Sequence, residues 1–232
     1  MKMKIEIWSD VMCPFCYLGK RKFENALKQF ADKEYIEVEW KSFQLNPNLE
    51  TNPGINIQQY LSEYKGISTE QVIQMNNHLT QAGKVVGLEY YFDKIKVANT
   101  FKAQQLLKFA HTQGRQNEME ELLFDAYFTK GENVDDLAIL SKLANEAGLD
   151  TVEMHKEPER DKYTLLVQAD IAEASQLGIH GVPYFVFNRK FVVNGAQESP
   201  VFLDTLRKAF TDWSKDYPEI KQRPATFSYK PV

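Results

Sequence analysis

The sequence predicts an α/β protein whose strands lie near both ends of the chain and enclose a long helical middle. Near the N-terminus, apolar and polar residues alternate at 5–8 and again at 35–43, which predicts two strands. The segment between them has the apolar spacing of a helix, so the three together predict a β-α-β unit. From residue 57 to about 178 the apolar residues recur every three or four positions. The last part contains two short apolar runs and one amphipathic helix, which gives a β-β-α unit.

The first unit predicts two neighbouring parallel strands. In the second strand, Ile36, Val38 and Trp40 share one face, and charged residues occupy the other. The helix between the strands follows Cys13 and begins at Pro14, because proline suits the first helical position, where its missing N–H is not needed. A helix between consecutive strands favours a parallel pair.

The middle of the chain predicts a block of helices that ends where the sheet resumes. Glycines at 87, 114, 131 and 148 fall where these helices should stop. We expect helices at 57–64, 69–86, 98–113, 117–130, 135–147 and about 159–177. A buried strand then ends at Phe187, a return strand covers 191–194, and a last helix covers 200–213.

These elements divide the chain into one discontinuous sheet domain and one inserted domain. We predict that residues 1–50 and 178–216 form the sheet domain and that 51–177 form an all-helical insertion. Residues 217–232 contain three prolines and mixed charge, which predicts an extended tail.

Composition limits the classes of partner. The 232 residues carry a formal net charge of −4, which gives no basic footprint for nucleic acid, and no apolar run is long enough to span a membrane. The N-terminal residues form an alternating strand and not the apolar core of a signal peptide, so we expect a cytoplasmic protein. Two cysteines in a chain of this length also suit a reducing compartment.

The two cysteines, Cys13 and Cys16, form a Cys-Pro-Phe-Cys motif at the predicted start of a helix. A helix N-terminus stabilises a thiolate, which is the form that attacks a disulfide, and can lower a thiol pKa from about 8.5 to roughly 3.5–7.5. Cys16 lies one turn further on, where it can resolve a mixed disulfide. We therefore assign Cys13 as the nucleophile and Cys16 as the resolving thiol.

Three other interpretations of the cysteine pair compete with redox chemistry. A zinc site needs more ligands, but no second Cys-x-x-Cys exists and the four histidines are more than twenty residues apart. A structural disulfide framework normally has more cysteines in a shorter chain. Inert buried thiols are the third interpretation. The strand–proline–helix context favours redox chemistry, which needs no metal or organic cofactor.

The motifs together resemble a known family. The segment SDVMCPFCYLG at 9–19 is followed by FQLNP at 43–47, ANT at 98–100, LFDAYF at 123–128, GVPYF at 181–185 and NGAQ at 194–197. This order resembles the thioredoxin fold with a large helical insertion, as in the DsbA family, and most of all its FrnE-like cytoplasmic branch. The resemblance implies a thiol–disulfide oxidoreductase or disulfide isomerase whose partners are protein or small-molecule thiols and disulfides, with glutathione as a candidate electron partner.

The resemblance also implies site residues beyond the cysteines. It implies a cis peptide bond between Val182 and Pro183 that faces the cysteines, and substrate contacts from Pro14, Phe15, Val182 and Pro183. The alternative is an ordinary trans proline that opens a strand. Strongly oxidising DsbA proteins carry histidine where Phe15 stands, so we expect a less oxidising couple here, and a potential near −120 mV would contradict this.

Two other functions compete with the oxidoreductase. Kappa-class glutathione transferases and hydroxychromene-carboxylate isomerases resemble the chain near 181–183, but they generally carry serine at the first active position and lack the second cysteine. A peptide-binding holdase without redox activity is the third candidate. An apolar face on the helical block makes a homodimer a further expectation.

Several charged residues near the cysteines have two interpretations each. Lys20, Arg21 and Lys22 could add positive potential near Cys13, but a solvated helix face is the default expectation. Asp10 is a candidate proton shuttle to Cys16 and, equally, a candidate loop cap.

Overall fold

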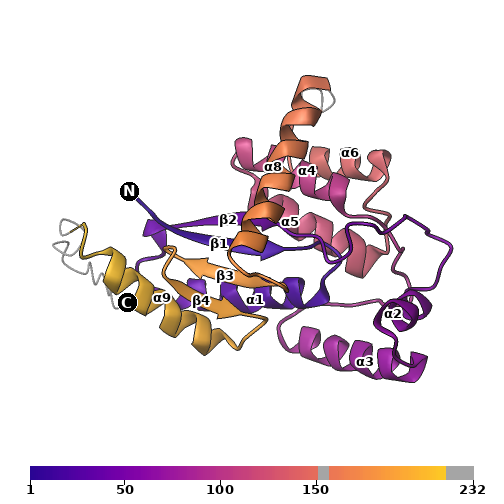
Figure 1. The fold of residues 1–232 in the computed structure, drawn as a ribbon. Coiled ribbons are helices and arrows are strands. Elements are labelled where there is room, and N and C mark those ends of the chain that lie inside the picture. Colours follow the sequence, from indigo (N-terminus) through magenta and orange to yellow (C-terminus); the bar gives the residue numbers. More distant parts are fainter. Residues whose placement is uncertain (151–156, 218–232) are drawn as a thin grey trace, which may run out of the picture.

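The computed structural model describes residues 1–150 and 157–217, and its core is one four-stranded sheet. The strands are β1 (Met3–Ser9), β2 (Ile36–Ser42), β3 (Tyr184–Phe187) and β4 (Phe191–Asn194), in the spatial order β2-β1-β3-β4. β1 pairs parallel with β2 and antiparallel with β3, and β3 pairs antiparallel with β4. The β-α-β and β-β-α units of a thioredoxin fold are confirmed (Figure 1).

Helices cover both faces of this sheet (Figure 1). On one face, α1 (Pro14–Gln29) and α9 (Ser199–Trp213) pack on the alternate side chains Ile5 and Ile7 of β1. On the other face, Trp8 and Val186 pack against the end of α8 (Glu157–Gln176). Successive side chains of a strand point to opposite faces of the sheet, so β1 contributes side chains to a hydrophobic core on each face.

The short helix η1 (Lys33–Tyr35) precedes β2. The helical middle after β2 follows the predicted order, with one difference at a helix end and one within a helix. Its elements before α8 are α2 (Ile57–Lys65), α3 (Thr69–Val85), α4 (Phe101–Thr112), α5 (Gln116–Phe124), η2 (Asp125–Lys130) and α6 (Leu137–Glu146). The helix predicted at 98–113 begins only at Phe101, because the Asn99 side chain accepts a hydrogen bond from the Phe101 amide and holds the preceding turn open. The helix predicted at 117–130 continues from α5 into the π-helical turns of η2.

Buried polar contacts hold the helical middle against the sheet. The Gln116 side chain accepts a hydrogen bond from the Trp40 amide and donates one to the Trp40 carbonyl, so it pairs with the outer strand β2 as a neighbouring strand would. Asp170 on α8 accepts a hydrogen bond from the Ser42 amide and forms ion pairs with Lys41 and Lys108. These contacts fix α4, α5 and α8 relative to β2.

Three further points concern the predicted organisation. The domain division at residues 51 and 177 stays a prediction. All of the predicted tail except Tyr217 lies outside the described residues. Within the described part of the chain, every helix is too short or too polar to cross a membrane.

Candidate active site

Cys13 occupies the N-cap position of α1, directly before Pro14 at the first helical position. Its backbone is extended (φ −91°, ψ 109°), its amide donates to the Asp10 carbonyl, and its carbonyl accepts from the Cys16 amide at 3.0 Å. The two cysteines are not bonded to each other. The two cysteines differ in exposure. Cys13 is 4% exposed and lines an open cavity, whereas Cys16 is completely buried.

The loop before β3 faces Cys13. The peptide bond between Val182 and Pro183 is cis, and the Cys13 thiol donates a hydrogen bond to the Val182 carbonyl at 3.5 Å. Gly19 permits this approach, since a Cβ there would lie 2.9 Å from the Pro183 Cγ atom. The absence of a side chain at Gly19 therefore lets α1 and the proline loop meet.

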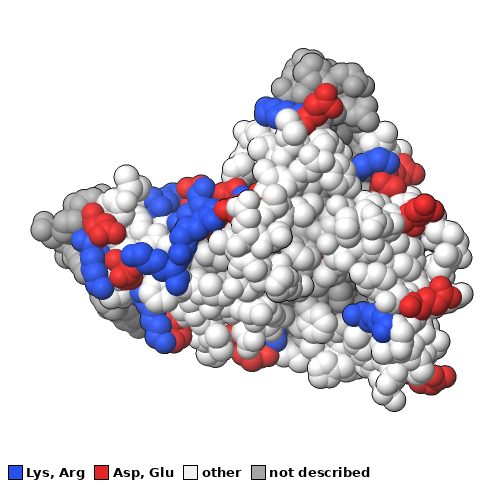
Figure 2. Space-filling view, viewed as in Figure 1, with Lys and Arg blue, Asp and Glu red and all other residues white. Residues whose placement is uncertain are grey.

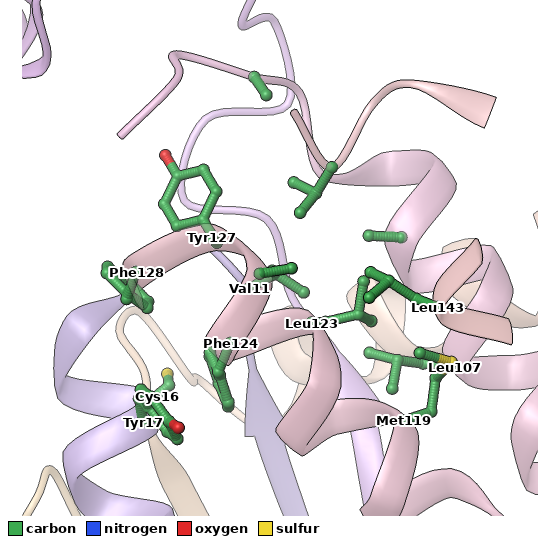
Figure 3. Close-up of a cluster of buried hydrophobic side chains, with 14 of the residues drawn as sticks. Val11, Cys16, Tyr17, Leu107, Met119, Leu123, Phe124, Tyr127, Phe128 and Leu143 are labelled. Carbon is green, nitrogen blue, oxygen red and sulfur yellow. The ribbon is translucent and has the colours of Figure 1, made fainter. Parts of the chain in front are cut away.

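The environment of Cys16 keeps its sulfur protonated. Burial raises the pKa of the Cys16 thiol well above its usual range, and the adjacent Cys13 sulfur raises it further. Hydrogen bonding from the Asp10 backbone and the Ser9 side chain opposes this shift. Figure 3 shows Cys16 and Tyr17 on α1, with the aromatic ring of Phe128 above them and that of Phe124 beside them. Cys16 thus needs a proton acceptor before it can attack a disulfide.

Glu120 provides a candidate acceptor. The Ser9 hydroxyl, which contacts Cys16, donates a hydrogen bond of 2.8 Å to one carboxylate oxygen of Glu120. The other oxygen is buried and has no hydrogen-bond partner among the described residues. Burial raises the pKa of Glu120 to about 7, although Ser9 and the charge of Lys20 lower it. A carboxyl with this pKa can accept and return a proton near neutral pH.

A cavity of about 270 Å³ opens beside Cys13. Of the four residues that the resemblance assigns to substrate, Pro14, Phe15 and Val182 line the cavity, and Pro183 lies with its ring against Gly19. Phe15 is 42% exposed. The opposite walls come from α2, α3 and η2, so the cavity lies between the sheet and the helical middle.

Comparison with known proteins agrees with this geometry. The family model for the DsbA-like thioredoxin domain matches residues 4–207. The chain belongs to this DsbA-like family. YwbO of Bacillus subtilis strain 168 is 29% identical over 217 residues, which cover 93% of this chain and 99% of YwbO. A crystal structure of the probable DsbA oxidoreductase SCO1869 from Streptomyces coelicolor is 34% identical, has a TM-score of 0.83 and covers 90% of this chain and 91% of that one.

A more distant structure shares the fold. The cytosolic disulfide reductase DsbM from Pseudomonas aeruginosa, solved with glutathione, is 13% identical with a TM-score of 0.56 and covers 93% of this chain and 99% of DsbM.

In the DsbA-like chain, the part that the structure describes has no group of three or more His, Cys, Asp or Glu side chains placed to hold a metal ion.

In this DsbA-like chain, the side chain of Asp10 connects its own loop after β1 to the loop after β2 and to the turn before α4 by hydrogen bonds. Its buried carboxylate accepts hydrogen bonds from the Leu45 amide and the Thr100 hydroxyl at 2.7 Å each, and a longer one from the Met12 amide. Burial raises the pKa of Asp10 to about 6 despite these donors. Its side chain is thus occupied by backbone and hydroxyl donors, which favours the interpretation as a cap.

The expectation of a solvated basic face on α1 is wrong. Lys20 is 2% exposed, and its ammonium group contacts Glu24 and Glu121 at 2.6 Å each. Lys22 is also buried and pairs with Glu198. The physical reason is that α5 and the loop before α9 cover this side of α1, and carboxylates on both sides compensate the buried charges.

Sequence reasoning missed Glu120. It lies 111 positions from Ser9, on a helix where a glutamate is common, so no spacing signal connects it to the cysteines. An apolar helix face that carries one carboxylate was the only available signal.

Proposed function

We propose that this DsbA-like protein is a dithiol–disulfide oxidoreductase in which Cys13 attacks and Cys16 resolves. The observation that carries the proposal is the asymmetry of the two sulfurs. Cys13 lies at the start of α1 and lines a cavity, whereas Cys16 is buried beside the Ser9–Glu120 pair. One sulfur is thus accessible to substrate, and the other can reach only the first.

The reaction then proceeds in two displacements. The Cys13 thiolate attacks a substrate disulfide, one substrate sulfur leaves and takes a proton, and the other stays bonded to Cys13. The Cys16 thiol next gives its proton through the Ser9 hydroxyl to Glu120 and attacks the Cys13 sulfur, and the second substrate sulfur leaves as a thiolate that takes a proton from water. Two electrons pass from the dithiol to the substrate, and the reverse sequence oxidises a substrate dithiol.

Several finer assignments belong to this proposal. We include disulfide isomerase activity, membership of the FrnE-like branch, and a cytoplasmic location, which the small number of cysteines supports. We also include substrate contacts from Pro14, Phe15, Val182 and Pro183. A homodimer and glutathione as electron partner stay predictions.

Equilibration in glutathione buffers of graded ratio, followed by trapping and weighing of the thiols, tests the proposal. We expect one reversible two-electron transition between about −270 and −120 mV. Cys16→Ser should accumulate a mixed disulfide with substrate, and Cys13→Ser should form none. Thiols that never pair, or that form only a stable glutathione adduct, would contradict the oxidoreductase and favour a glutathione-dependent enzyme. Cys16→Ser with full activity would do the same.

The holdase alternative has its own test. A protein with Cys13→Ala and Cys16→Ala together should lose thiol–disulfide exchange, and we expect it to give no suppression of client aggregation. Suppression equal to that of the wild type would favour a binding protein without redox function.

A further inference from the structure

The cavity beside Cys13 is lined almost entirely by uncharged residues. Lys65, at the end of α2, is the one charged residue among the described side chains of this lining. On α1, Lys20 and Lys22 are each paired with carboxylates. The view in Figure 2 also shows mostly uncharged atoms over the centre of the molecule. A thiolate at Cys13 therefore depends mainly on uncharged donors, above all the backbone amides at the start of α1.

The amide of Phe15 is the donor that is free for this purpose. Phe15 is the second residue of α1, and its N–H has no hydrogen-bond partner among the described residues, whereas the Cys16 amide donates to the Cys13 carbonyl at 3.0 Å. An N-cap side chain normally accepts a hydrogen bond from the second or third amide of its helix. The Cys13 thiol instead donates to the Val182 carbonyl at 3.5 Å. Once the thiol loses its proton, the sulfur can only accept, and the Phe15 amide is available to it.

The other end of the same peptide unit is bound by Tyr90. The Pro14 carbonyl and the Phe15 amide belong to one peptide unit, and the Tyr90 hydroxyl donates a hydrogen bond to this carbonyl at 2.8 Å. A hydrogen bond to a peptide carbonyl polarises the unit and strengthens its N–H as a donor, by roughly 10–30%. The contact from Tyr90 therefore improves the donor that is available to the Cys13 sulfur.

Packing fixes the Tyr90 hydroxyl in this position. Tyr90 is buried in the segment between α3 and α4, where its ring stacks on that of Phe92 with 5.5 Å between centroids and meets that of Phe128 edge to face. Gly83 on α3 leaves room for the ring, since a Cβ there would lie 2.5 Å from it. Burial raises the pKa of Tyr90 above its usual range, and negative charge on Tyr17 and on the two cysteine sulfurs raises it further. The phenol thus keeps its proton and stays a donor.

We propose that Tyr90 is a positioning residue for disulfide exchange, which stabilises the Cys13 thiolate through the peptide unit between Pro14 and Phe15. The inference rests on the proposed function, in which this thiolate is the attacking group. The thiolate exists only in the reduced protein, so its stabilisation favours the reduced form and makes the couple more oxidising. Loss of the Tyr90 hydroxyl should therefore make the couple more reducing.

Tyr90→Phe tests this role, because it removes the hydroxyl and keeps the ring. The measurement is the equilibrium constant for reduction of the Cys13–Cys16 disulfide by glutathione, in buffers of graded ratio from pH 5 to 9. We expect this constant to fall about threefold at pH 9, which corresponds to a potential about 15 mV lower. The difference from the wild type should shrink as acid protonates Cys13, because a neutral thiol needs the Phe15 donor less.

Two further variants locate the effect. Tyr91→Phe is the matched control, since Tyr91 is the exposed next residue and its hydroxyl donates to Glu89 at 3.0 Å, so this variant should keep the wild-type potential at every pH. Gly83→Ala displaces the Tyr90 ring without removing its hydroxyl, and it should shift the potential in the same direction as Tyr90→Phe. Gly83→Ala also keeps the inference testable if Tyr90→Phe does not fold.

The outcomes separate this inference from the proposed function. If Tyr90→Phe keeps the wild-type potential, differs from it by the same factor at every pH, or shifts it no more than Tyr91→Phe does, Tyr90 contributes only packing, and the inference fails while the oxidoreductase stands. If the thiols of the wild-type protein do not pair in these buffers, the proposed function itself fails.

Discussion

Replacement of Glu120 by glutamine should change how the stability of the protein depends on pH. Burial raises the pKa of Glu120 to about 7 from 4.5, a shift of about 2.5. Each pKa unit corresponds to about 1.4 kcal/mol, so the charged form of Glu120 costs the folded protein about 3–4 kcal/mol. Glutamine keeps an acceptor for the Ser9 hydroxyl but does not ionise, so Glu120→Gln removes this cost.

Glu120→Gln should gain stability relative to the wild type as the pH rises, because the pKa of Glu120 is raised in the folded protein. Because the folded pKa lies above the unfolded one, the neutral carboxyl is favoured in the folded state, and its contribution is fully present below about pH 4.5 and lost as the pH rises through 7. The free energy of unfolding of Glu120→Gln should therefore rise relative to that of the wild type by up to about 3–4 kcal/mol between pH 4.5 and 8.5. Asp10 titrates in the same range but is present in both proteins, so its contribution largely cancels.

Urea unfolding of the reduced proteins at several pH values measures this difference. Glu118→Gln is the matched control, because Glu118 is exposed on the same helix, and its curve should run parallel to that of the wild type. Glu120→Gln also tests the role of Glu120 in accepting the proton of Cys16. Release of the second thiol from a preformed mixed disulfide should slow about a hundredfold at pH 8 in Glu120→Gln and lose an inflection near pH 7.

Parallel curves for Glu120→Gln and the wild type would refute the reasoning about stability. They would mean that Glu120 has the same pKa in the folded and unfolded protein, and hence that the carboxyl is solvated. An unchanged rate of thiol release, with the stability difference present, would refute only the role of Glu120 as proton acceptor.

Three further predictions concern the surroundings of the site. Gly83→Ala should lower the free energy of unfolding by about 1–3 kcal/mol in urea, because a Cβ would lie 2.5 Å from the Tyr90 ring; unchanged stability would contradict that packing. Asp170→Asn should lower it by about 3–5 kcal/mol, since Lys108 loses its buried partner, and a loss below 1 kcal/mol would count against the ion pair. Phe15→His should raise the reduction potential by tens of millivolts in glutathione buffers, and an equal or lower potential would refute the role assigned to this position.

The sequence by itself determined the elements whose signals are local. Alternation in β1 and β2, proline after Cys13 and the paired apolar runs near the C-terminus each act through neighbouring residues, so the parallel pair, the C-terminal hairpin and the place of the cysteines could be predicted. The pairing of β1 with β3 joins the two ends of the chain and followed only from the folded protein. Helix ends were less well determined. The late start of α4 depends on the side chain of Asn99, which also donates to the Leu49 carbonyl fifty positions away.

The tertiary structure decided which distant groups meet. Glu120 reaches Ser9 because α5 packs on the end of the sheet, and Lys20 is buried because the same helix covers it. Tyr90 reaches the Pro14 carbonyl because the segment after α3 packs on α1. Each of these side chains is ordinary for its segment, and its burial depends on contacts between elements far apart in the chain. Spacing along one segment carries no information about such contacts, so the pKa of Glu120 and the hydrogen bond from Tyr90 follow only from the folded protein.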